Sequence, residues 1–166
     1  MRKLGRTTKQ RIAVLRNQAS NLLWYGKLTT TKQNAKELQS YVEKIITDAI
    51  NNYADYTQVT RKRTVDGKET EVSITVDGVK KLAARRRIMN KTYDIQEVKS
   101  KDENRTDFKA RVGNVKHPLI EKIFNEIAPK YAERKENLGQ GGGYTRIYTL
   151  EQRRGDAAEV AVIELI

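Results

Sequence analysis

Two stretches near the start of the chain carry apolar residues at the three-to-four-residue spacing of an amphipathic helix. The apolar positions of the first are Ile12, Leu15, Ala19, Leu22 and Leu23. Those of the second are Ala35, Leu38, Val42, Ile45, Ile46 and Ala49. Thr7 and Gln10 have the spacing of a capping box before the first helix, and Gly26 is a typical residue at its end. We expect both stripes to be core positions that pack on each other or on a shared sheet.

A β-hairpin is predicted in the middle of the chain. Val59 to Val65 and Lys68 to Val76 are rich in β-prone residues, and Asp66-Gly67 between them favours a type I′ turn. The extension as a whole covers residues 53–83 and includes three cations at residues 61–63. These cations fit a contact with RNA, and they fit equally well a solvated hairpin that charge keeps soluble. Both interpretations stay open on the sequence alone.

The rest of the chain predicts two more helices, an irregular segment and two strands. The helices cover residues 80–91 and 118–129, the irregular segment 92–117, and the strands 144–150 and 159–166. Pro118 suits a first helical turn, and Pro129 is expected to end or kink the helix. The last strand is nearly all apolar, which predicts burial on both faces. At 166 residues the chain has the length of one domain.

Positive charge is concentrated at the start of the chain. The formal net charge is +12, and the first acidic residue is Glu37. Nine cations precede it, so the first 36 residues carry +9 and the other 130 carry +3. A field this uneven repels itself unless a polyanion neutralises it, and nucleic acid is the commonest such partner because binding releases its counterions. The alternative is a basic soluble surface with no partner.

The residue types exclude several classes of site. The chain has no cysteine and a single histidine, His117, so it can form neither a disulfide nor a thiolate or multi-histidine metal site. It also lacks a Walker A or GxGxxG pattern. We therefore expect no enzyme activity, no cofactor, no metal and no small-molecule substrate. No early apolar run is long enough for a signal peptide or a membrane span, which predicts a cytoplasmic protein without a membrane partner.

Several separated blocks, in the same order, resemble one known family. They are Lys3 to Thr7, Leu15 to Asn17, Thr29-Thr30, Ala35 to Leu38, Arg85 to Met89, Ile123 to Ala132, Gly142 to Ile147, and Arg153 to Glu159. On these blocks the chain resembles the bacterial large-subunit ribosomal protein L-seventeen family. Because the blocks are many and ordered, the match is far more specific than any one short motif.

The resemblance implies a fold and a function. The implied fold is a single two-layer α+β domain over residues 1–166, in which helices pack on a small mixed sheet in the order helix, strand, helices, two C-terminal strands. The implied function is that of a structural constituent of the bacterial large (50S) ribosomal subunit, which binds and stabilises 23S rRNA near the peptide exit side. Ribosomal protein L-thirty-two is the implied protein neighbour. Compared with compact members of the family, this chain is longer at an inserted hairpin, residues 53–83, and at a variable insertion, residues 92–117.

The charge asymmetry and the matched blocks together predict three RNA contacts. They are a basic arm at residues 1–6 with the first helix, an arginine cluster, and a glycine-rich loop with the turn after it. Arginine grips phosphate with two parallel bonds, aromatic rings can stack on bases, and glycine allows close backbone approach. The predicted RNA-binding residues are Arg2, Lys3, Arg6, Lys9, Arg11, Arg16, Trp24, Arg85, Arg86, Arg87, Lys91, Gly142, Gly143, Tyr144, Arg146, Arg153 and Arg154.

Two other functions are compatible with part of this pattern. A DNA-binding architectural protein shares the charge, but it typically reads a groove with a helix and has dimer symmetry. An RNA-processing enzyme needs an acidic or histidine cluster, and the spacing of the carboxylates offers none.

Overall fold

The computed structural model describes residues 2–65, 68–113 and 115–166, without the side chains of residues 63–65 and 68–70. Two long helices, α1 (Thr8–Tyr25) and α2 (Lys32–Ile50), follow one another with only β1 (Lys27–Thr31) between them. The Gln10 side-chain oxygen accepts a hydrogen bond from the Thr7 amide at 3.3 Å, as the capping box predicts. Gly26 ends α1 with a φ of 79°, a conformation that glycine adopts without strain.

A three-stranded sheet covers the helices on one side. It consists of β1, β4 (Thr145–Gln152) and β5 (Glu159–Leu165), in the order β1-β5-β4. Thr29 lies opposite Val162, and Ile147 lies opposite Ile163. The α+β class is therefore confirmed, although both pairings are antiparallel and the expected mixed sheet is not formed.

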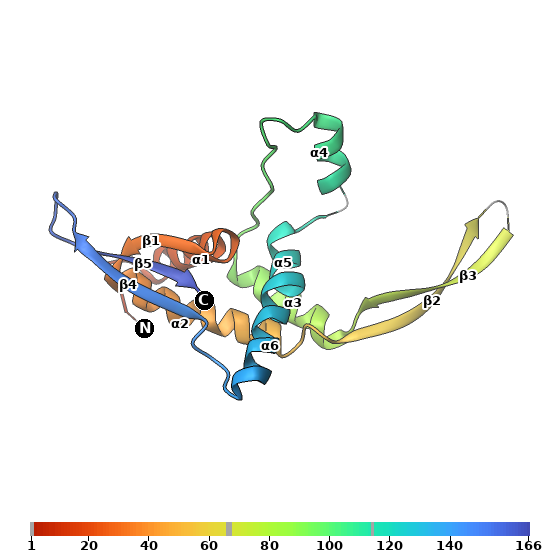
Figure 1. Cartoon of the computed structure of the whole chain (residues 1–166), viewed down its shortest axis with the longest axis horizontal. Helices are drawn as coiled ribbons and strands as arrows, with labels where there is room; N and C mark the ends of the chain where they lie inside the picture. Colours follow the sequence, from red (N-terminus) through yellow and green to blue (C-terminus); the bar gives the residue numbers. More distant parts are fainter. Residues whose placement is uncertain (1, 66–67, 114) are drawn as a thin grey trace.

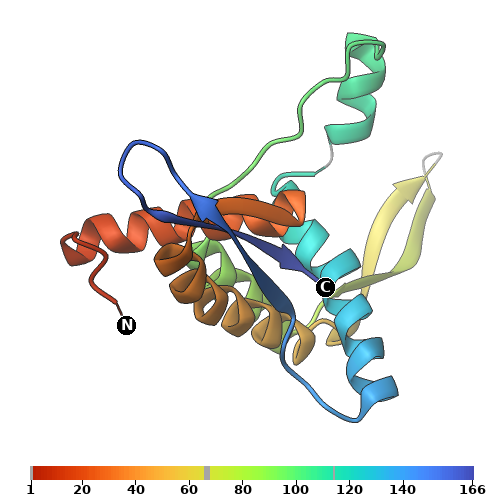
Figure 2. The same cartoon turned by 60° about the vertical axis from the view of Figure 1, so that its left-hand side comes forward.

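The last strand, β5, is central but not buried on both faces. Ala161 and Ile163 are fully buried on the face that packs on α1 and α2, whereas Val160 and Val162 on the other face are only half-buried. The prediction of burial on both faces is wrong because helices cover only one side of the sheet (Figure 2).

The core confirms the two predicted apolar stripes almost completely. All of the stripe on α2 is buried, and on α1 only Ile12 is half-exposed. The core also includes Ala84 and Ile88 of α3 (Val79–Lys91). These residues fix the face of each helix that points inward, and so they also fix the face that meets solvent.

One continuous helical rod follows the variable segment. It consists of α5 (Pro118–Lys122), a π-helical turn η1 (Ile123–Ile127) and α6 (Ala128–Leu138). The amide of Ala128 bonds to the Ile123 carbonyl, five residues back. This wider turn directly before Pro129 accommodates the proline ring, which would otherwise clash with the preceding turn. Of the two expectations for Pro129, an end or a kink of the helix, the end is therefore wrong.

Two segments stand away from the rest of the molecule (Figures 1 and 2). One is the predicted hairpin, with β2 (Tyr56–Val65) and β3 (Lys68–Asp77) paired antiparallel along their full length. Its Asp66-Gly67 turn lies outside the described residues, and residues 79–83 belong to α3. The other is residues 92–117, which include the short helix α4 (Arg105–Val112). We call the remaining residues the body.

Candidate nucleic-acid interface

The basic arm folds against the start of α2. The amide of Arg6 donates to the Lys3 carbonyl at 3.2 Å, so residues 3–6 form a turn in which Leu4 and Gly5 have φ values of 55° and 63°. The amide of Arg2 donates to the Glu37 carboxylate at 3.1 Å. This bond places the arm beside the first turns of α2.

The cations of the arm and of α1 are not neutralised by the chain itself. Within the described residues, no carboxylate lies within ion-pair distance of any of these side chains. The six are Arg2, Lys3, Arg6, Lys9, Arg11 and Arg16. The first four are exposed and the last two are half-buried. Their charge therefore has to be balanced by solvent ions or by a ligand.

Arg11 and Arg16 also have unused donors. In the part of the chain that the structure describes, the Nε atom of each is buried with no hydrogen-bond acceptor. Arg16 lies beside Tyr41, where burial raises the pKa of the phenol and the guanidinium opposes that rise. Tyr41 in turn donates to the Lys91 carbonyl at 2.9 Å, which ties α2 to the end of α3.

The predicted arginine cluster on α3 divides into different roles. Arg85 is largely buried and pairs with Asp77 at 2.5 Å and Glu121 at 2.7 Å. Burial lowers the pKa of Arg85, but the Glu121 and Asp77 carboxylates outweigh this and raise it overall. Arg87 makes two bonds to Asp48, at 3.0 and 2.7 Å. Of these three arginines, only Arg86 is exposed and has no ion pair with a described residue.

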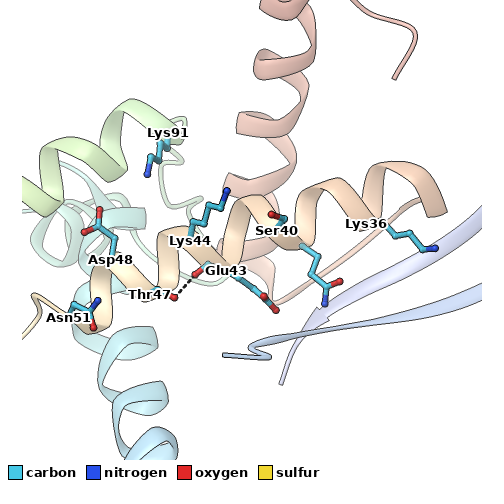
Figure 3. Close-up of a pocket in the computed structure, with 9 residues that line it drawn as sticks. Lys36, Ser40, Glu43, Lys44, Thr47, Asp48, Asn51 and Lys91 are labelled. Carbon is cyan, nitrogen blue, oxygen red and sulfur yellow. Dashed lines mark hydrogen bonds between the residues drawn. The ribbon is translucent and has the colours of Figure 1, made fainter. Parts of the chain in front are cut away.

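A groove runs along the exposed side of α2 (Figure 3). Its volume is about 700 Å³, and it lies between the end of α3 and the sheet. The lining residues are Lys36, Gln39, Ser40, Glu43, Lys44, Thr47, Asp48, Asn51 and Lys91.

The charges in this groove favour an anion. Glu43 accepts a hydrogen bond from the Thr145 hydroxyl at 3.0 Å, and Asp48 is paired with Arg87. The lysines at 36, 44 and 91 have no carboxylate within ion-pair distance in the described part of the chain. Sequence reasoning selected Lys91 and missed Lys36 and Lys44. The four-residue repeat Lys36, Ser40, Lys44 on the polar side of the helix was the signal that could have found them.

The glycine-rich loop and the β4–β5 turn present a third group of predicted residues. Gly142 and Gly143 are exposed with φ values of 100° and 59°, which a side chain would strain. Arg146 and Arg154 are exposed. Arg153 instead pairs with Asp156 at 2.9 and 2.6 Å, which holds the pKa of that carboxyl at about 2.

The two predicted aromatic contacts are placed less favourably. Tyr144 is buried, with its ring centre 5.0 Å from that of Tyr131, so its ring is a core contact and cannot stack on a base. Trp24 is half-buried, and Lys122 Nζ lies 5.2 Å from its ring centre. The hollow beside Trp24 is lined in part by Glu97, Glu121 and Glu126, which repel phosphate.

The described residues offer neither a metal site nor a membrane-spanning helix. Within the described ranges, no group of three or more His, Cys, Asp or Glu side chains is arranged to hold a metal ion. No helix in those ranges is both long and apolar enough to span a bilayer. His117 precedes α5 and lies 3.4 Å from Asp94, with both side chains partly exposed.

Comparison with known proteins gives a consistent result. A family model described as "Ribosomal protein L17" matches residues 14–166. Proteins named "Large ribosomal subunit protein bL17" are similar over 99% of this chain: that of Ruminiclostridium cellulolyticum is 37% identical over 98% of its length, and that of Lachnospira eligens 36% over 98%. The protein of that name from Clostridium botulinum strain Hall is 35% identical over 96% of its length. The chain therefore belongs to the ribosomal protein L17 family.

Proposed function

We propose that this chain is a structural constituent of the large ribosomal subunit, located in the cytoplasm, where it binds and stabilises large-subunit (23S) rRNA. The relatives that match its full length carry the name of a large-subunit protein. The observation that carries RNA binding is the set of six cations on the arm and α1, none of which has a carboxylate partner among the described residues. A polyanion supplies the missing charge.

The proposed RNA surface extends from the arm along the groove of α2. The arm is tied to Glu37, and the residue before it, Lys36, lies at the beginning of the groove. Lys44 and Lys91 follow along the groove. Most contacts of this kind go to phosphate and sugar, so the surface recognises the shape and backbone of folded RNA more than its bases.

The paired arginines have a second role in this proposal. Arg85, Arg87 and Arg153 each bond to a carboxylate of the chain, so an RNA contact from them would break an ion pair. We assign these three to shaping the surface. Among the predicted contacts outside the arm and α1, we assign direct phosphate binding to Arg86, Lys91, Arg146 and Arg154, with the Gly142-Gly143 backbone beside them.

Sedimentation and competition test this function. In extract fractionated on a sucrose gradient, we expect the chain to travel with the large subunit. In a binding competition, folded large-subunit RNA should displace a bound RNA probe at far lower concentration than duplex DNA does. Equal displacement by duplex DNA would instead favour a DNA-binding architectural protein. A chain that sediments free of the subunit would overturn the proposed function.

The resemblance also suggests a protein neighbour, ribosomal protein L-thirty-two. Mapping cross-links from the body of the chain in isolated subunits tests it: peptides of that protein should be joined to this chain. Cross-links from the body to other proteins alone would refute this assignment and leave RNA binding untouched.

A further inference from the structure

The hairpin β2–β3 differs from the rest of the molecule in charge. Residues 56–77 contain four cations and four anions, so the hairpin has no net charge in a chain with a net charge of +12. A segment that binds RNA gains affinity from excess positive charge, because each neutralised phosphate releases counterions. The hairpin as a whole has no such excess, so its net charge does not favour RNA.

The two faces of the hairpin are chemically different. Residues directly opposite each other in an antiparallel pair share a face, and faces alternate along each strand. The pairs Thr57–Val76, Val59–Ile74 and Arg61–Val72 therefore form one face. Among the described side chains of this face, which we call the aliphatic face, four are Val or Ile, one is Thr, one is Arg and none is acidic. The pairing continues this face to Arg63–Thr70 and Val65–Lys68, so by register three of the hairpin's four cations belong to it.

The opposite face is polar. Its described pairs are Gln58–Thr75, Thr60–Ser73 and Lys62–Glu71, with Tyr56–Asp77 at the base. An apolar face on one side and a polar face on the other is the pattern of a sheet that packs on something through one face.

Part of the aliphatic face is open to solvent, whereas Val59 and Val76 are half-buried. Val72 is 37% exposed and Ile74 is 38% exposed. Each strand has ten residues, so the hairpin reaches about 30 Å at roughly 3.4 Å per residue. Figures 1 and 2 show it standing clear of the body along this length. A two-stranded hairpin alone is marginally stable in water, and packing on a further surface stabilises it.

The base of the hairpin is held firmly to the body. Lys81 of α3 is 1% exposed, pairs with Asp77 of β3 at 3.1 Å, and places its Nζ 3.7 Å from the ring centre of Tyr56 of β2. Asp77 also pairs with Arg85, which continues to Glu121 of α5. These contacts tie both strands to two helices, so the hairpin projects in a defined direction.

We propose that the aliphatic face of the hairpin docks on a neighbouring protein of the same particle. The complementary surface is aliphatic and carries a carboxylate opposite Arg61. The aliphatic side chains decide between the two macromolecules: packing the four described ones against phosphates would bury those phosphates without hydrogen bonds, whereas a protein surface can cover them and pair its carboxylates with the cations of this face. The inference goes beyond the proposed function and rests on it only for the identity of the particle.

Site-specific photo-cross-linking tests this docking face. A photoreactive phenylalanine analogue is placed at Ile74 on the aliphatic face, or at Thr75, its neighbour on the polar face, as the matched control. Val72 serves as a second position on the aliphatic face in case one variant misfolds. Cells of the source bacterium are irradiated, the large subunit is isolated, and adducts are digested separately with ribonuclease and with protease.

We expect one discrete protein adduct from Ile74 and Val72 that survives ribonuclease, at least about fivefold stronger than from Thr75. Mass spectrometry should map it to an aliphatic surface of a subunit protein that has a carboxylate nearby. RNA adducts, equal yields from the two faces, or no adduct from either aliphatic position would each overturn the inference. Sedimentation on a sucrose gradient separates the two proposals. If the chain sediments with the large subunit but gives no protein adduct, only the docking face is refuted. If the chain sediments free of the subunit, the proposed function is refuted.

Discussion

The hairpin and the body handle charge in different ways. The hairpin balances four cations with four anions, and residues 92–117 balance six with five, so eleven of the twelve net positive charges lie on the body. On the body, the arm and α1 leave their cations unpaired in the described structure, whereas at the hairpin base Lys81 and Arg85 share Asp77. Unpaired charge is available to a ligand, and paired charge holds elements together. The two regions therefore serve binding of different kinds of partner.

The largest expected effect comes from removing unpaired charge on the body. Replacing Arg6, Arg11 and Arg16 by Ala together should weaken RNA binding and flatten its log–log salt dependence by about 0.7 to 0.9 per lost phosphate contact, about 2 to 3 in all. Equilibrium binding to large-subunit RNA over a range of salt concentrations measures this slope.

The matched control is a triple alanine substitution of the hairpin cations Arg61, Lys62 and Arg63. It removes the same charge and should leave the slope unchanged. If the hairpin triple flattened the slope as much as the body triple, the contrast between the two regions would be refuted.

A smaller effect is expected where the two regions join. Asp77→Ala leaves the buried Lys81 ammonium without its carboxylate, and breaking such a pair costs about 3 kcal/mol of folding free energy. Denaturant unfolding measures the change. Asp156→Ala removes the carboxylate of an exposed pair and is the control, for which we expect a much smaller loss. A neutral Asp77→Ala would show that the hairpin base is not held by this pair.

Gly78→Ala tests the same junction more gently. A Cβ at Gly78 would lie 2.3 Å from Asp55 Oδ2, the atom that accepts the amides of Lys80 and Lys81 at the start of α3. Displacing this carboxylate should cost about 1 kcal/mol, as the loss of a helix cap does. Thermal unfolding of Gly155→Ala gives the control, because its Cβ would meet open space. Equal melting temperatures for the two variants would contradict this account.

The smallest effect concerns the Arg153–Asp156 pair. Arg153 holds the pKa of Asp156 at about 2, so the stabilisation from this pair is present above the ordinary carboxyl pKa and is lost as the pH falls toward 2. Carboxyl carbon shifts in NMR spectra report this titration, and Arg153→Gln should move it upward. An Asp156 titration that Arg153→Gln leaves unmoved would contradict this account.

Periodicity in the sequence was enough to predict the core of the two long helices. Leu38, Val42 and Ile45 recur on one face of α2, and all three are buried. Pro129 was harder, because the π-helical turn that accommodates it depends on a single shifted hydrogen bond from Ala128. No residue type in that stretch signals such a shift, so the sequence predicted only that the helix would end or kink there.

The candidate site was predictable in its location and less so in its members. The unpaired arm follows directly from the absence of acidic residues before Glu37. The division among Arg85, Arg86 and Arg87 does not, because the partners Glu121 and Asp48 lie 36 and 39 residues away in sequence. The burial of Tyr144 is hidden from the sequence for a similar reason, because its ring packs on Tyr131 of α6. Long-range packing decides these roles.

The central position of β5 also sets an order for building the molecule. Thr29 of β1 pairs with Val162, so the sheet cannot close during synthesis until nearly all of the chain has been translated. The hairpin, whose strands are adjacent in sequence, can zip together once Asp77 has been added. The hairpin can thus be complete while α1 and α2 still lack β5, the strand that packs on them.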